Sequence, residues 1–282
     1  MMPGWRRPET GSRLAYPSPN HAQRFIGPMT LVGVLSLAAT PTAGQVTPTS
    51  LPASALPRTA DGRPNLQGVW QVLNTAAWDI QDHNARAGVP AGQGVVEGND
   101  IPYQAWAVAQ KQKNFENRMT ADPETKCFMP GVPRITYMPL PFQIVQTQKF
   151  TAIVYEYIHI NRTIYTDGSQ HPPGSIDWWM GDSRGRWEGD TLVVDVVHFN
   201  DQTWFDRAGN FHSDALHLVE RYTLTDIDHI NYEVTIEDPK VFTSPWKMRM
   251  VLYRRKEPHV QLLEYECFAY RADDEEARSL GK

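Results

Sequence analysis

The sequence has few cysteines and none of the motifs that mark several common enzyme classes. Only Cys127 and Cys267 occur among 282 residues. There is no P-loop, G-x-G-x-x-G, G-x-S-x-G or H-E-x-x-H, so nucleotide-binding, α/β-hydrolase and zinc-protease chemistry have no support. No apolar run approaches the roughly twenty residues that span a bilayer. We therefore expect no stable membrane insertion.

Two interpretations of the cysteines stay open. An even number suits one disulfide in an oxidising compartment, where a bridge across so long a loop stabilises a fold by up to about 5 kcal/mol. Two buried free thiols are the alternative. A catalytic cysteine is disfavoured because neither residue lies in a nucleophile motif.

The N-terminal segment has the layout of a secretory signal peptide. Arg24 precedes an apolar run over residues 29–39, and the small residues Thr42 and Gly44 follow it. We expect residues 1–44 to be removed and the mature chain to be secreted or periplasmic. Removal leaves 23 Lys and Arg against 31 Asp and Glu, which changes the net charge from −5 to −8. A negative net charge disfavours nonspecific binding to the phosphates of nucleic acid. We therefore do not expect nucleic acid as a partner.

One folded domain is predicted after a polar linker. Residues 45–60 are rich in Pro, Thr, Ser and Ala and are expected to be disordered. The domain covers residues 61–272, and residues 273–282 form a C-terminal tail. One helix is predicted over residues 101–119, with Asp100 as its N-cap, packed outside the sheet or across one end of it.

The rest of the chain alternates apolar and polar residues with a period of two, which is typical of β-strands. Short turns such as Asp167-Gly168 and Gly189-Asp190 predict antiparallel neighbours. So many strands leave costly open edges unless the sheet closes. We therefore predict a mostly all-β fold, an antiparallel up-and-down barrel with one flanking helix. The predicted strands cover residues 66–73, 135–138, 142–147, 151–158, 162–166, 176–181, 184–188, 191–199, 216–225, 229–236, 246–254 and 261–268.

Gly68-x-Trp70 at the start of the first strand, with a long meander and a late arginine after it, resembles the lipocalin and calycin barrels. The resemblance implies that Trp70 packs under a basic side chain from later in the chain, either Arg254 or Arg271. A tryptophan at this position is also common in an ordinary core.

A second resemblance covers nearly the whole mature chain. It looks like a family of uncharacterised secreted bacterial proteins, and it implies secretion and one β-rich domain but no activity. A Cys-His-Glu motif of that family is absent, since Phe268 and Ala269 follow Cys267. The matching segments are DGRPNLQGVW (61–70), CFMPGVPR (127–134), the YEY, R and I of YEYIHINRTI (155–164), GRWEGDTLVVD (185–195), HSDALHLVER (212–221) and IEDPK (236–240).

Metal-independent acid–base catalysis is expected where the longest loop of the meander meets the next strand. His212, Asp214 and His217 stand there, and a histidine that titrates near neutral pH works with a carboxylate in such chemistry. One alternative is a loop held by hydrogen bonds alone. Another is a metal site that includes Glu220, but strand alternation turns Glu220 away from His217. We therefore expect no metal and no cofactor.

Four further residues are expected to bind the substrate. Trp204 lies in a polar loop near Asp201, where its ring can stack on a sugar or cap an apolar ligand. Arg162 and His171 belong to a preceding hairpin, and Arg162 can hold a carboxylate or an oxyanion.

These observations predict a secreted β-barrel enzyme that catalyses hydrolysis or elimination on a small sugar-like or partly apolar substrate. One alternative is a non-catalytic, lipocalin-like protein that binds a small molecule. A second is a structural module of the cell envelope, which would have no cavity. A carrier needs an almost wholly apolar cavity inside the barrel. An enzyme needs a histidine and a carboxylate within hydrogen-bond reach at the floor or mouth of the barrel.

Overall fold

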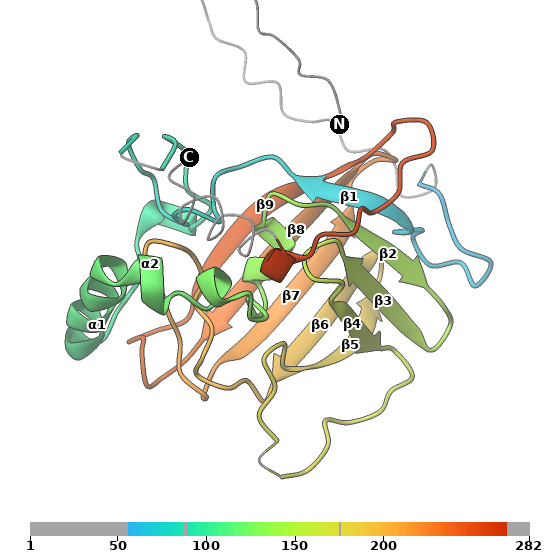
Figure 1. The fold of residues 1–282 in the computed structure, drawn as a ribbon. Coiled ribbons are helices and arrows are strands. Elements are labelled where there is room, and N and C mark those ends of the chain that lie inside the picture. Colours follow the sequence, from blue (N-terminus) through green and yellow to red (C-terminus); the bar gives the residue numbers. More distant parts are fainter. Residues whose placement is uncertain (1–55, 87–88, 175, 270–282) are drawn as a thin grey trace, which may run out of the picture. The chain divides into compact units, whose positions relative to one another are not determined.

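The computed structural model describes residues 56–86, 89–174 and 176–269. In this part of the chain, nine strands form one closed barrel in sequence order, and β9 pairs with β1 (Figure 1). The predicted signal peptide and C-terminal tail lie outside the described residues. The strands are β1 (Gly68–Val72), β2 (Phe142–Gln146), β3 (Phe150–Tyr155), β4 (Asn161–Tyr165), β5 (Asp182–Glu188), β6 (Thr191–Val197), β7 (His217–Leu224), β8 (His229–Glu237) and β9 (Trp246–Arg254).

One strand pair is parallel. Ile164 and Tyr165 of β4 lie beside Ser183 and Arg184 of β5 in parallel register, whereas the other pairs are antiparallel. Parallel neighbours need a long connection, because the chain must return to the end of the sheet where it started. The segment 176–181, predicted as a strand, belongs to this connection. The prediction of antiparallel pairing throughout is therefore wrong at β4–β5.

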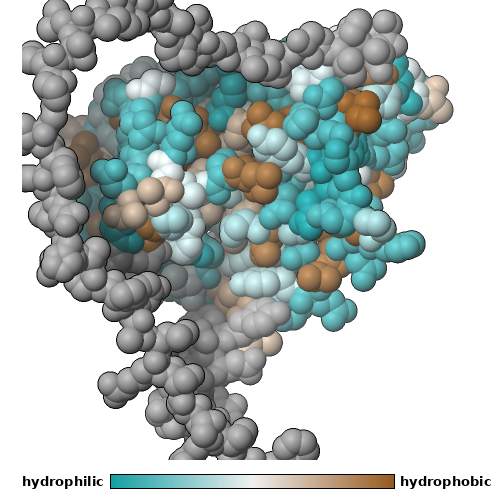
Figure 2. Space-filling model, turned by 90° about the horizontal axis from the view of Figure 1, so that it is seen from above, coloured by the Kyte–Doolittle hydropathy of each residue, from teal (hydrophilic) through white to brown (hydrophobic). Residues whose placement is uncertain are grey.

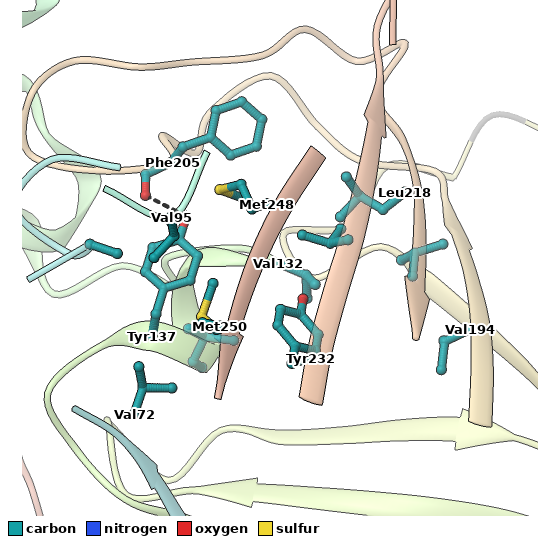
Figure 3. Packing of buried hydrophobic residues seen from close by; sticks show 14 of the residues in the cluster. Val72, Val95, Val132, Tyr137, Val194, Phe205, Leu218, Tyr232, Met248 and Met250 are labelled. Carbon is teal, nitrogen blue, oxygen red and sulfur yellow. Dashed lines mark hydrogen bonds between the residues drawn. The ribbon is translucent and has the colours of Figure 1, made fainter. Parts of the chain in front are cut away.

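Alternation of buried and accessible residues explains why the later strands form. Every second residue of β7, β8 and β9 is buried, so one face of each strand points into the barrel. Figure 3 shows Val194, Leu218, Tyr232, Met248 and Met250 packed together in this core. The mostly all-β barrel is thus confirmed.

The predicted helix begins later than expected and is interrupted. It consists of α1 (Ala105–Glu116) and α2 (Arg118–Ala121), beside the barrel in Figure 1. Residues 101–104 are extended instead, because Tyr103 pairs with Phe242 and the Gln104 backbone N–H donates to the Val241 carbonyl at 2.8 Å. Among the described helices, none is long and apolar enough to cross a membrane.

Three short 3₁₀ helices complete the elements: η2 (Glu97–Asn99), η3 (Pro123–Lys126) and η4 (Arg134–Tyr137). The prediction of a strand over residues 135–138 is wrong, because η4 occupies this segment. All four of its residues are buried. A short apolar run buried on every side carries no period that separates helix from strand.

A disulfide joins Cys127 to Cys267, with 5.5 Å between their Cα atoms. The bridge holds the segment after η3 against the C-terminal part of the described chain. The predicted strand 261–268 is wrong, since only Tyr265 pairs there, in an isolated bridge to Tyr157. The two tyrosine rings stack with centroids 5.6 Å apart.

Trp70 and Arg254 make the contact expected at the start of β1. The guanidinium of Arg254 lies 4.2 Å from the Trp70 ring centroid, and its Nη1 donates to the Gln67 carbonyl at 2.6 Å. Gly68 has a φ of 136°, and a Cβ there would lie 2.2 Å from Arg254 Nη1. Glycine is therefore required at this position. The other expected partner, Arg271, lies outside the described residues.

The described chain begins before the predicted domain start at residue 61. Leu56 is buried, and Arg58 forms an ion pair with Asp190 at 2.9 Å. On the face seen in Figure 2, hydrophobic residues stand singly between hydrophilic ones, as is ordinary for a folded surface.

Candidate functional site

A line of polar side chains crosses four neighbouring strands at one end of the barrel wall. Arg184 of β5 lies opposite Asp195 of β6, and His217 of β7 lies opposite Glu237 of β8. Neighbours along the strands, such as Val196, are buried in the core. Alternation therefore turns these polar side chains to the outer face.

Asp195 binds two histidines with its two oxygens. His217 Nε2 lies 2.8 Å from Oδ1, and His171 Nε2 lies 2.8 Å from Oδ2. Their other ring nitrogens also face carboxylates, since His217 Nδ1 is 3.2 Å from Glu237 and His171 Nδ1 is 2.5 Å from Asp182. Only the imidazolium form supplies two N–H donors to such a pair of acceptors. For His217, which lies between Asp195 and Glu237, this geometry favours the protonated ring.

The electrostatics of His217 and Asp195 agree with this assignment. Burial lowers the pKa of His217, but hydrogen bonds to Asp195 and Glu237 outweigh burial and raise the pKa above its ordinary value. Burial raises the pKa of Asp195, but hydrogen bonds from His217 and His171 bring it below its ordinary value. The raised pKa favours the acid form of His217, which can donate a proton.

The connection between β4 and β5 positions His171. Asp182 at the start of β5 binds His171 and also accepts from Arg184 Nε at 2.7 Å. Burial raises the pKa of Asp182, but hydrogen bonds from Arg184 and His171 lower it overall. Arg184 also donates to Ser169 Oγ at 2.7 Å and stacks on the ring of Tyr165 at 4.6 Å. These contacts fix the connection against the barrel.

His198 and Trp178 lie next to this cluster. The His198 ring centroid is 6.1 Å from that of His171 and 5.9 Å from that of Trp178. The backbone N–H of Trp178 donates to the His198 carbonyl at 2.9 Å. His198 has a φ of 64°, which is uncommon for residues other than glycine. Neither His198 nor Trp178 is among the catalytic or substrate-binding residues predicted from the sequence.

A pocket of about 270 Å³ opens beside the cluster. Its lining includes His171, Arg184, Arg186 and Asp195, together with residues 168–170. This volume is near the lower limit for small-molecule sites. The charged lining suits a compact polar molecule better than an apolar one.

His212, predicted to be catalytic, is buried and is not part of the Asp195 cluster. Its Nδ1 donates to the Ser213 carbonyl at 2.8 Å, and its Nε2 accepts from the Thr203 hydroxyl at 2.6 Å. Its ring lies between those of Phe199 and Phe205. Burial lowers the pKa of His212. Both nitrogens are used, so this neutral ring holds the loop in place.

Asp214, the predicted partner of the two histidines, points to solvent. It pairs with Lys240 at 2.6 Å, and both side chains are more than half exposed. Hydrogen bonding to Lys240 lowers the pKa of Asp214. In the structure, which describes all three predicted catalytic residues, no hydrogen bond joins Asp214 to His212 or His217.

Arg162 lies inside the barrel, on the opposite side of the sheet from His171. It forms a fully buried ion pair with Glu220, and its Nε donates to Ser183 Oγ at 3.0 Å. The hydroxyls of Tyr222 and Tyr232 donate to Glu220 Oε1 at 3.0 and 2.8 Å. The barrel interior therefore has a charged centre.

Trp204 and Asp201, predicted to bind substrate, lie in the loop between β6 and β7. Trp204 is half-buried against the core and pairs with Phe211 in an isolated bridge, whereas Asp201 is exposed. No ring or hydrogen-bond contact joins either described side chain to His171 or His217.

Glu220 and His217 point to opposite sides of the sheet, since Glu220 faces the interior. Within residues 56–86, 89–174 and 176–269, no group of three or more His, Cys, Asp or Glu is arranged to hold a metal ion.

Of the predicted site residues, the structure brings His171 and His217 together, through a third residue that the sequence analysis missed. Asp195 lies in the strand predicted over residues 191–199, where an outward polar residue resembles ordinary surface. Its role depends on the register of β6 against β5 and β7. The available signal was the alternation itself, which predicts that Asp195 points outward.

No protein-family model, no curated protein and no solved structure matches the chain.

Proposed function

We propose that the protein is an enzyme that uses acid–base chemistry for hydrolysis or elimination on a small, polar, sugar-like substrate. The site is the cluster of His171, Asp195 and His217. The single observation behind the proposal is that one carboxylate binds two imidazoles at 2.8 Å beside a polar pocket. A carboxylate that orients a histidine is a recurring arrangement in proton-transfer catalysis.

His217 is the proposed proton donor. Asp195 orients its ring through Nε2, and Nδ1 points toward Glu237, whose side chain is 44 % exposed. An exposed ion pair is weak, so a substrate oxygen can replace the Glu237 carboxylate. In hydrolysis, the proton on Nδ1 passes to the leaving oxygen as its bond to carbon breaks, and a water molecule forms the new bond to that carbon. Neutral His217 then accepts the proton that this water releases, which restores the acid form. His171 holds the second oxygen of Asp195 and fixes the carboxylate in place.

A non-catalytic carrier is the less supported function. A carrier of apolar molecules needs an apolar interior, whereas Arg162 and Glu220 place a buried ion pair there.

We also propose that the barrel is lipocalin- or calycin-like and that the protein is secreted or periplasmic. The Trp70–Arg254 contact supports the first proposal, and the parallel pair β4–β5 is a departure from it. The Cys127–Cys267 disulfide supports the second, because such bridges persist in oxidising compartments. The expected partner is a small molecule rather than nucleic acid.

The test is a screen of glycosides, uronides and small esters with the purified protein, repeated with Asp195→Asn. We expect the variant to lose about 100-fold or more of any activity found, the range typical of general acid–base groups. His229→Gln is the matched control, because His229 also pairs with a carboxylate, Asp226 at 2.8 Å, elsewhere on the outer wall. Full activity in Asp195→Asn would contradict the proposal.

A further inference from the structure

We propose that the pocket beside the cluster binds an oxyanion group of the substrate, a carboxylate or a phosphate, through Arg186 and Arg184. This inference rests on the proposed function and specifies the class of its substrate. Both arginines line the pocket together with His171. Guanidinium groups recognise carboxylate and phosphate through two parallel, charge-assisted hydrogen bonds.

Ion pairs connect the charged side chains on the outer wall around the pocket. Asp182, Asp195 and Glu188 are each shared by two basic side chains, so a basic side chain can turn from one of these carboxylates without leaving it unpaired. The basic side chains of these pairs are His171, Arg184, Arg186, His217 and Arg221.

Arg186 can turn to a ligand without leaving a carboxylate unpaired. Its side chain is 59 % exposed and pairs with Glu188 at 2.7 Å. Glu188 also pairs with Arg221 at 3.0 Å, and the two guanidinium groups use different oxygens. Glu188 therefore keeps one partner when Arg186 moves. An exposed pair of this kind contributes little, so the exchange has a low cost.

Arg184 is already held in a fixed position. Its ring contact with Tyr165 and its hydrogen bonds to Asp182 and Ser169 restrain the guanidinium. Three of its five N–H donors make these bonds to described residues, which leaves two for a ligand. A restrained donor loses little entropy on binding. Arg184 thus supplies the preformed part of the oxyanion site and Arg186 the mobile part.

The experiment measures binding of glucuronate, glucose 6-phosphate and glucose to the full chain by calorimetry. We expect at least one of the two anionic sugars to bind, glucose to bind at least tenfold more weakly, and the anion affinity to fall with added salt. Arg186→Gln should weaken anion binding about tenfold, as expected when a charge-assisted hydrogen bond is lost. Glu188→Gln should strengthen it, because Arg186 is released from its competitor.

Arg249→Gln is the matched control, since Arg249 is 57 % exposed and pairs with Glu233 at 2.5 Å away from the pocket. It should leave binding unchanged. Equal binding of glucose and the anionic sugars, or no binding of either anion, would overturn the inference. Because no turnover is measured, this failure differs from failure of the proposed function, which would appear as full activity in Asp195→Asn.

Discussion

Asp206 shows how one buried carboxyl group can organise a loop. It is fully buried, and its oxygens accept from the backbone N–H groups of Ile80 and Ala208 at 2.9 Å and of Asn210 at 3.1 Å. Burial, with a smaller contribution from Asp79, raises its pKa to about 6. The sequence predicted catalytic and substrate-binding residues in this loop, but Asp206 and His212 bind other residues of the loop and the backbone instead.

We expect Asp206→Ala to lower the free energy of unfolding by about 3 kcal/mol or more, since buried donors without partners cost roughly 1–3 kcal/mol each. The folded pKa lies above the unfolded value, so the folded state binds more protons between about pH 4 and pH 6. The contribution of Asp206 to the free energy of unfolding therefore falls as the pH rises through this window. The Asp206→Ala variant should lack this dependence of the free energy of unfolding on pH. Urea denaturation at several pH values measures both effects. A loss below about 1 kcal/mol, with the slope unchanged, would refute this account of Asp206.

At the scale of elements, period-two patterning predicted β7, β8 and β9 within one or two residues, because one face of each is buried and the other accessible. It failed at residues 135–138, which lie largely in the buried helix η4, and at residues 261–268, which are mostly exposed and pair only through the isolated bridge of Tyr265. The parallel pair β4–β5 could not be predicted, because local alternation is the same in parallel and antiparallel neighbours.

Only part of the candidate site could be predicted, because a local sequence pattern does not show which strands pair. His171 and His217 were identified as titratable residues in plausible places. Their shared partner Asp195 could be recognised only from strand register and from the path of the β4–β5 connection. Pairing between residues far apart in the chain is not contained in a local pattern.

The Cys127–Cys267 disulfide is an element-scale restraint that can be removed. It closes a separation of 140 residues and holds Tyr265 near Tyr157. Cys127→Ser with Cys267→Ser should lower the free energy of unfolding by about 2–5 kcal/mol. Urea denaturation of the double variant measures this loss, and limited proteolysis should cut it earlier than the parent near Tyr265. Equal stability and equal cleavage would contradict a structural role.

At the scale of the whole molecule, the barrel closes around the Arg162–Glu220 pair. Removing one member of a buried ion pair leaves an uncompensated charge, which costs about 3–5 kcal/mol. We expect this loss in the free energy of unfolding for Glu220→Gln, measured by urea denaturation. The matched control is Glu233→Gln on the outer wall, where the exposed pair with Arg249 contributes about 1 kcal/mol or less. Similar losses in both variants would show that the interior pair has no special role.

The central role of Asp195 is to orient His217 and to favour its protonated form. NMR titration of the histidine rings tests this claim most directly. The pKa of His217 should lie above its unperturbed value of about 6.5 and should fall in Asp195→Asn. Stability from the His217 contacts is then present below about pH 6.5 and is lost as the pH rises through the folded pKa. A His217 pKa at or below 6.5, insensitive to Asp195→Asn, would contradict the account.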